Sequence, residues 1–166
     1  MDMQNELDEK RLYFIGKCMV TLSVCILIMI GICHFFFIFS YVPTDSMEPT
    51  ISKGGRTVGY KFCHKYKKGD VILFENNQQE KCVKRIIGIG GDCVEIKDGR
   101  LYINKKLITE TYIVDDSSNG MDGKWTVPKD CFFVMGDNRK TSRDSRQWTQ
   151  PFIKKKDIDA VCIFMI

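Results

Sequence analysis

Apolar residues along the chain form one long N-terminal run and several short runs separated by turn residues. Residues 18–44 carry no formal charge and are apolar on every face of a helix. Because a helix rises about 1.5 Å per residue, this run exceeds the roughly 20 residues that cross a bilayer. We expect a transmembrane helix over residues 18–41, preceded by a tail over residues 1–17.

A cleaved secretory signal peptide is the competing interpretation of this segment, because basic residues precede it between positions 10 and 17. Cleavage requires small residues of the A-x-A type, and the chain has a single alanine, Ala160. Residues 39–43 offer no such site, so we expect the segment to remain as an anchor. The positive-inside rule then places the tail in the cytoplasm and residues 42–166 outside the membrane.

The remainder of the chain has the pattern of a β domain. Short apolar runs alternate with Gly, Asp and Asn, and none follows the 3.6-residue period of a helix. We therefore expect a mostly β fold, in which one N-terminal helix precedes an antiparallel β domain. The apolar runs are 71–74, 82–89, 131–135 and 160–164.

One hairpin is predicted in detail within residues 93–103. Asp98-Gly99 is a typical two-residue turn, and pairing about it places apolar side chains opposite one another on one face. We expect this hairpin to form most of a small insertion at about 93–130, with an exposed loop at 115–124. The facing pairs are Ile96 with Leu101 and Val94 with Ile103.

Composition narrows the possible classes of protein. A chain of 166 residues that is 44% hydrophobic suits one folded domain rather than a disordered chain. A net charge of +4 does not indicate a nucleic-acid partner. The eight cysteines lack C-x-x-C spacing, which argues against a structural zinc site and favours small buried thiols over disulfides.

A serine directly beyond the apolar segment is a candidate nucleophile. Ser46 lies between Pro43 and Pro49, and two nearby prolines stiffen a turn that can hold a hydroxyl at one angle. A serine in such a turn is more often structural than catalytic. A nucleophile also needs a base, and His64 lies in a very polar run where we expect it to be exposed and uninvolved.

A lysine within an apolar run is the alternative base. Lys84 lies inside the run 82–89, and burial would lower its pKa. A shift from about 10.4 to a working value near 7 to 8 corresponds to roughly 4 kcal/mol, so the site must exclude water. The competing interpretation is an edge strand that exposes Lys84 and Arg85 to solvent.

A polar loop at residues 136–146 follows the run at 131–135 and gathers Asp, Asn, Arg and Ser side chains. Such a loop can orient a catalytic amine through hydrogen bonds and hold itself together through ion pairs. A solvated charged turn is the alternative interpretation.

Taken in order behind one apolar segment, four stretches of the chain resemble the sequence boxes of bacterial type I signal peptidases. They are residues 43–50, 69–74, 84–92 and 136–146. The resemblance implies that Ser46 is the nucleophile and Lys84 the general base of a Ser-Lys dyad. It also implies an oxyanion hole made by the Ser46 backbone N–H and by the hydroxyl of Thr44, which stands where the family has a serine.

The same resemblance assigns supporting roles to further residues. Ser142 is expected to hydrogen-bond the Lys84 amine, and Met47 to pack beside the nucleophile and shape the substrate groove. Ion pairs that support the site are expected from Arg85, Asp137, Asp144 and Arg146. No metal or other cofactor is implied.

By resemblance, the external domain over residues 42–166 is a serine endopeptidase that removes signal peptides from exported preproteins. The expected protein is a monomer in the cell membrane that contacts lipid and no nucleic acid. Two alternatives stay open: a non-catalytic anchored β module that binds envelope partners, and a relative of the self-cleaving Ser-Lys repressors. The repressors are soluble and carry a DNA-binding domain, of which this chain shows no sign.

Overall fold

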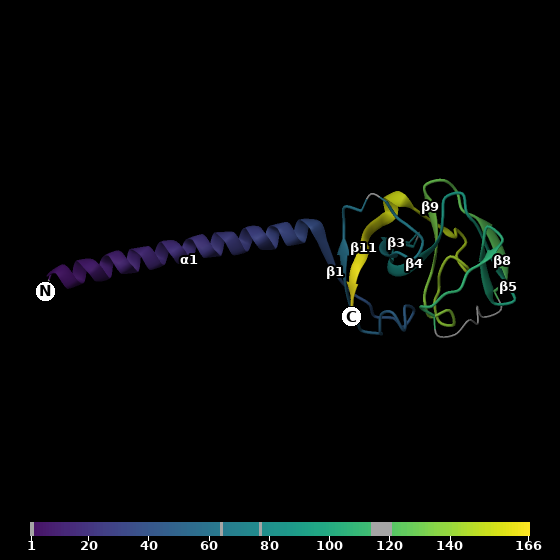
Figure 1. Cartoon of the computed structure of the whole chain (residues 1–166), viewed down its shortest axis with the longest axis horizontal. Coiled ribbons are helices and arrows are strands. Elements are labelled where there is room, and N and C mark those ends of the chain that lie inside the picture. The colour runs from purple at the N-terminus through teal and green to yellow at the C-terminus, as the bar shows by residue number, and fades with distance from the viewer. Residues whose placement is uncertain (1, 64, 77, 114–120) are drawn as a thin grey trace. The chain divides into compact units, whose positions relative to one another are not determined.

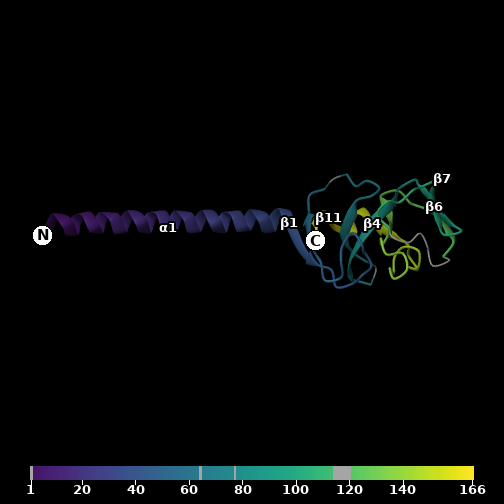
Figure 2. The same ribbon diagram turned by 60° about the horizontal axis from the view of Figure 1, so that its bottom comes forward.

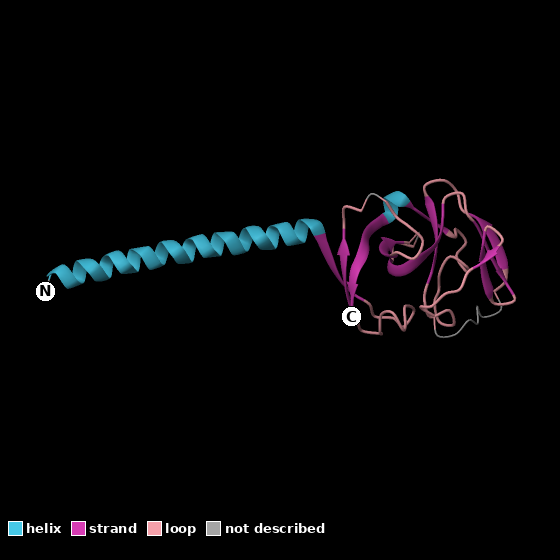
Figure 3. Ribbon diagram, in the orientation of Figure 1, coloured by secondary structure: helices cyan, strands magenta, loops and turns pink. Residues whose placement is uncertain are grey.

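The fold is mostly antiparallel β with one N-terminal apolar helix, as the hydrophobic pattern predicted. The computed structural model describes residues 2–63, 65–76, 78–113 and 121–166. It divides into the helix and a compact unit over Phe37–Ile166. Figure 3 shows helical ribbon in the long N-terminal helix and one short turn, whereas strands make up the framework of the compact unit.

Helix α1 (Asp2–Phe36) contains a segment, Lys10–Phe36, that is long and apolar enough to cross a membrane. Its large apolar side chains are exposed on all sides of the helix. Thr21 and Ser23 donate their hydroxyls to the carbonyls four residues earlier, at 2.8 and 2.9 Å. Both hydroxyls are therefore satisfied within the helix, as an apolar surrounding requires.

The helix ends earlier than the boundary expected at residue 41. Phe37–Tyr41 instead forms strand β1, which pairs with β2 (Arg56–Tyr60) in antiparallel register. Phe, Ile and Tyr fit a pleated surface well, but in the sequence they continue the hydrophobicity of the helix without a break. Hydrophobicity alone therefore placed these five residues in the wrong element.

The larger sheet has seven strands in the order β1-β2-β11-β3-β4-β9-β10, and all its pairs are antiparallel. The four predicted apolar runs form β3, β4, β9 and β11, as expected. The C-terminal strand β11 lies between β2 and β3. The further bounds are β3 (Val71–Glu75), β4 (Lys81–Ile89), β9 (Cys131–Met135), β10 (Phe152–Lys154), the 3-10 turn η1 (Lys155–Asp157) and β11 (Ile158–Met165).

A smaller sheet has the strand order β7-β6-β5-β8 and contains the predicted hairpin in its predicted register. Figures 1 and 2 place this sheet at the end of the compact unit opposite β1 and β11. Of the loop expected at 115–124, Gly123 and Lys124 belong to β8, and residues 115–120 lie outside the described residues. The bounds are β5 (Cys93–Lys97), β6 (Arg100–Ile103), β7 (Lys106–Leu107) and β8 (Gly123–Thr126).

Three clusters of buried side chains form the core. One cluster lies beneath the turn that carries Ser46 and includes Met47, Ile51 and Leu73. A second joins the two sheets, because it contains Val94 of β5 together with Phe133 of β9. All eight cysteines are free thiols; Cys162 is buried, and the other four outside α1 are partly buried.

Gly88 of β4 allows the two sheets to approach closely. A Cβ atom at this position would lie 2.5 Å from Val94 Cγ2 and 3.2 Å from Val127 Cγ2. Both valines are fully buried, so neither can move aside without a change in packing. The glycine therefore sets the distance between the sheets.

Gly88→Ala should destabilise the compact unit by about 1–3 kcal/mol, because the added methyl group overpacks this contact. Val94→Ala removes the nearest obstacle, so the double variant should lose less stability than the sum of the two single variants. Urea unfolding of the detergent-solubilised protein, followed by tryptophan fluorescence, measures all three. Additive losses would contradict the proposed contact.

Candidate active site

Ser46 is held in a tight turn between β1 and β2. Val42 exchanges two backbone hydrogen bonds with residues 54–55, at 2.8 and 2.9 Å, which closes the loop. Within the loop, the side chains of Met47 and Ile51 are fully buried. These contacts fix the backbone on both sides of Ser46, so its hydroxyl is held in one place.

Lys84 lies in the first part of β4, residues 81–84, where the described strand pairing is on one side of the strand. On one side Lys84 is opposite Ile72 of β3. On the other side the described pairing with β9 begins only at Arg85, which is opposite Met135. Residues 81–84 therefore present a free backbone edge that leads to the Lys84 side chain.

The two predicted dyad residues are in contact. Lys84 Nζ donates a hydrogen bond to Ser46 Oγ at 2.6 Å, and the two residues are only 5% and 6% exposed. Burial lowers the pKa of Lys84, because an ammonium ion loses its hydration there; the Asp144 carboxylate acts in the opposite direction, and the Arg146 guanidinium acts with burial. Lys84 is thus not a solvated cation on an edge strand.

Thr44 lies beside this pair. Its hydroxyl oxygen is 3.2 Å from Ser46 Oγ, and either hydroxyl can be the donor. Thr44 is exposed, whereas Ser46 is buried. The Thr44 hydroxyl is therefore available to a group that binds next to the serine.

The loop over residues 136–146 packs against the backbone of Ser46. Asn138 N donates to Ser46 O at 3.1 Å. A Cβ atom on Gly136 would lie only 2.4 Å from the same oxygen and 2.2 Å from Ser142 Oγ. Glycine is required here because any side chain would push the loop away from the serine.

Asp144 organises this loop. Its carboxylate accepts bonds from Gly136 N at 3.0 Å and Ser142 Oγ at 2.7 Å, and Arg146 donates to it through Nε at 2.8 Å and Nη2 at 2.9 Å. We expected Ser142 to bond the Lys84 amine, but the described hydrogen bonds include no such contact. The described hydrogen bond of the Ser142 hydroxyl is the one that it donates to the Asp144 carboxylate.

A second ion pair joins the loop to the turn and to β4. Arg85 donates to Asp137 through Nε at 2.8 Å and Nη2 at 2.6 Å, and Thr50 Oγ1 donates to the same carboxylate at 2.5 Å. Arg85 also donates to Gly69 O at 2.8 Å. Arg85 and Asp137 thus link three segments around Ser46 and Lys84. The contact of Thr50 with Asp137 was not anticipated.

A third ion pair was not anticipated. Arg139 donates to both carboxylate oxygens of Glu110, at 2.6 and 2.5 Å, and these two side chains are 5% and 3% exposed. Tyr112 donates its hydroxyl to Glu110, and its ring lies 4.1 Å from the Arg85 guanidinium. Burial and the Glu110 carboxylate raise the pKa of Tyr112, so its hydroxyl stays protonated. Glu110 gave no sequence signal, because it lies in a segment without a motif or period.

A cleft of about 450 Å³ opens on the dyad. Met47, expected to shape this groove, is fully buried in the core and is not among the residues that line the cleft. His64, the other base that we considered, lies outside the described residues. The lining comprises residues 40–46, Leu73, residues 80–84, Thr141 and Arg143.

Comparisons with known proteins show that this chain is a serine peptidase. The sequence model of the family described as "Signal peptidase, peptidase S26" matches residues 15–166. Signal peptidase I of Bacillus amyloliquefaciens is 34% identical over 145 residues, which cover 80% of this chain and 78% of that protein. Signal peptidase I P of Bacillus subtilis subsp. natto is 36% identical over 150 residues, which cover 81% and 80%.

A solved structure is also similar. The crystal structure of a signal peptidase I from Enterococcus faecalis has a TM-score of 0.51 and 31% sequence identity, and the match covers 58% of this chain and 96% of that chain. The chain therefore belongs to the signal peptidase, peptidase S26 family.

The Glu110–Arg139 pair provides a stability test. Glu110→Gln should destabilise the protein by about 3 kcal/mol, because it leaves the buried Arg139 guanidinium without its counter-charge. The double variant Glu110→Gln/Arg139→Met should recover part of this loss. Chemical unfolding of the detergent-solubilised protein measures the effect.

Glu95→Gln is the matched control, because Glu95 pairs with Lys124 at an exposed site, at 3.2 Å. Its cost should stay below about 1 kcal/mol. Equal losses from Glu110→Gln and Glu95→Gln would contradict the structural role of the buried pair.

Proposed function

We propose that this protein is a membrane-anchored serine endopeptidase that removes N-terminal signal peptides from exported preproteins through a Ser46–Lys84 dyad. The observation that carries the proposal is the 2.6 Å contact between two buried side chains at a cleft. The lowered pKa of Lys84 supports a neutral amine, which is the form that can accept a proton.

In the acylation step, the neutral Lys84 amine takes the proton of Ser46 while Ser46 Oγ forms a bond to the substrate carbonyl carbon. The carbonyl oxygen becomes an oxyanion, which the Ser46 N–H and the Thr44 hydroxyl stabilise by hydrogen bonds. The protonated Lys84 then gives its proton to the departing amine as the peptide bond breaks. The mature protein leaves, and the signal peptide stays as an ester on Ser46.

Hydrolysis repeats these transfers with water. Lys84 takes a proton from a water molecule, whose oxygen attacks the ester carbonyl, and the proton returns to Ser46 Oγ as the ester bond breaks. The serine and the amine are regenerated in their initial forms. No group beyond these side chains and water is needed to balance the steps.

The open edge of β4 suggests how the substrate lies. A peptide in extended form can add to the backbone of residues 81–84 as a further strand, as peptides do at other exposed sheet edges. Its scissile carbonyl then reaches Ser46, because Lys84 ends this edge. Backbone recognition of this kind suits an enzyme whose substrates share little sequence.

The apolar helix would hold the active site next to the membrane. We propose that Lys10–Phe36 spans the cell membrane with the N-terminus in the cytoplasm, so that the compact unit lies outside as a monomer at the lipid surface. The apolar segment of a signal peptide occupies the same bilayer. Anchoring both raises their effective concentration and sets the height at which the chain is cut.

Ser46→Ala and Lys84→Met should each lower the rate of preprotein cleavage by about 10⁴-fold or more, because either variant removes a partner of the proton transfer. Ser52→Ala and Lys53→Met are matched controls, since both residues are exposed and lie outside the cleft. The controls should keep the wild-type rate. The assay uses the full chain in lipid-detergent micelles with a purified preprotein.

The same assay separates the proposal from a non-catalytic anchored module. Wild-type cleavage that survives in Ser46→Ala or Lys84→Met would eliminate the dyad. Absence of cleavage by the wild-type protein, with all variants folded, would favour the binding module instead.

A further inference from the structure

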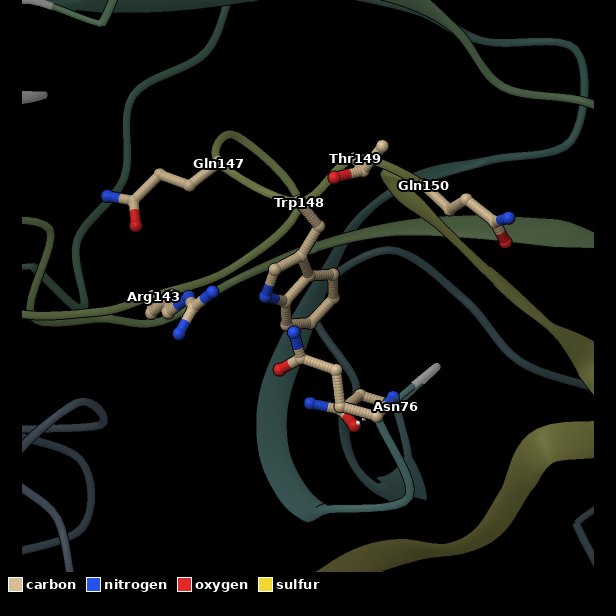
Figure 4. Close-up of a pocket in the computed structure, with 7 residues that line it drawn as sticks. Asn76, Arg143, Gln147, Trp148, Thr149 and Gln150 are labelled. Carbon is tan, nitrogen blue, oxygen red and sulfur yellow. Dashed lines mark hydrogen bonds between the residues drawn. The ribbon is translucent and has the colours of Figure 1, made fainter.

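Arg143 links the catalytic cleft to a second cavity. It lines the cleft that opens on Ser46 and also a neighbouring pocket of about 230 Å³. In Figure 4 the Trp148 indole stands at the centre of this pocket, with Arg143 and Gln147 to one side of it. A substrate chain in the cleft therefore passes a guanidinium at the mouth of a second cavity. The pocket is lined by Asn76, Gln78, Arg143, Gln147, Trp148, Thr149 and Gln150.

This pocket offers hydrogen-bond donors in excess of acceptors. Arg143 is exposed, and among the described residues its side chain makes no hydrogen bond or ion pair, unlike the buried Arg139 and Arg146 of the same loop. The N–H of Trp148 likewise has no acceptor among the described residues. A guanidinium and an indole N–H that face one cavity match a ligand rich in acceptors.

The rigidity of the pocket supports a binding role. The Trp148 ring packs against Phe74 of β3 with ring centres 6.1 Å apart, and Trp148 N donates to Asp144 O at 3.3 Å. Asn76 is buried and accepts bonds from two backbone N–H groups, both at 2.9 Å. Trp148 is thus held by a buried cluster of the core and by the loop over residues 136–146.

The other charged residues that line the cleft, Asp45, Glu80, Lys81 and Lys84, form no described ion pair with Arg143. Glu80 accepts a hydrogen bond from Asn76 Nδ2 at 2.8 Å, and Lys81 pairs with Glu75 at 3.1 Å and Asp159 at 2.8 Å. Arg143 therefore has no described counter-charge along the cleft. A bound peptide is the molecule that the cleft is proposed to receive.

We propose that Arg143 and this pocket form a charge-selective subsite that binds an acidic side chain of the substrate close to the scissile bond. The inference rests on the proposed function, because it assumes that a peptide occupies the cleft. An Asp or Glu carboxylate accepts bonds from the Arg143 guanidinium and the Trp148 N–H. The subsite would favour preproteins with an acidic residue at one position near the cleavage site.

The test is a set of matched peptides that span one signal-peptide cleavage site. Each pair differs by Asp against Asn at one position, from the third residue before the scissile bond to the third residue after it. With the full wild-type chain, one position should show a kcat/KM about fivefold higher for Asp than for Asn, which is the upper end of the effect of an exposed ion pair. The preference should shrink with added salt. Arg143→Gln should abolish this preference, so that the ratio of kcat/KM for the Asp peptide to that for the Asn peptide falls to about one.

Two further variants make the result specific to the pocket. Lys140→Gln removes the same charge from the same loop but lies outside both cavities, so its Asp preference should persist. Arg143→Glu should reverse the preference, so that Lys at that position is cleaved faster than Asn.

The outcomes separate the two proposals. If the wild-type chain cleaves the Asn peptides but no position prefers Asp, the subsite is wrong and the peptidase function stands. A preference that survives Arg143→Gln, or that Lys140→Gln removes equally, would also overturn the subsite. If no peptide is cleaved by the wild-type chain, the proposed function itself fails.

Discussion

The burial of one lysine amine against one serine hydroxyl is the constraint on which the rest of the site depends. An ammonium ion in this place would lose most of its hydration, so burial lowers the pKa of Lys84 and favours the neutral form. The core beneath the Ser46 turn holds the serine, and the pairing of β4 with β3 holds Lys84, so that Lys84 Nζ lies 2.6 Å from Ser46 Oγ. Burial thus favours the neutral form of Lys84, which is the form that the proposed dyad needs as a base.

The carboxylates around the dyad could undo this effect, because Asp144 and Asp137 both raise the pKa of Lys84. Each is held by an arginine through two hydrogen bonds, Asp144 by Arg146 and Asp137 by Arg85. Both pairs compensate the carboxylate charge locally. The Arg85–Asp137 pair also ties the loop over residues 136–146 to β4, whereas the Arg146–Asp144 pair lies within the loop. The polar loop therefore supports the dyad by keeping its own charges paired.

Much of this architecture could be predicted because it follows from local patterns. Apolar runs predicted β3, β4, β9 and β11, and one two-residue turn fixed the register of the small hairpin. Strand β1 was missed, because its residues continue the hydrophobicity of the helix, and hydrophobicity does not identify a partner strand. Glu110 was missed for a different reason: its role depends on Arg139, which is distant in the sequence, so no local period or spacing marks it.

The central claim is tested most directly by titration of the Lys84 amine. NMR of the Ser46→Ala variant with isotope-labelled lysine side chains follows the amine signals as the pH is changed, and this variant does not turn over substrate. The signal that disappears when Lys84→Met is added belongs to Lys84. Because its pKa is lowered, Lys84 loses its proton at a pH below the usual lysine pKa of 10.5. The amine becomes charged only when the pH falls through this lower pKa. The account predicts a midpoint for Lys84 below that usual value. A Lys84 midpoint at the usual lysine value would contradict it.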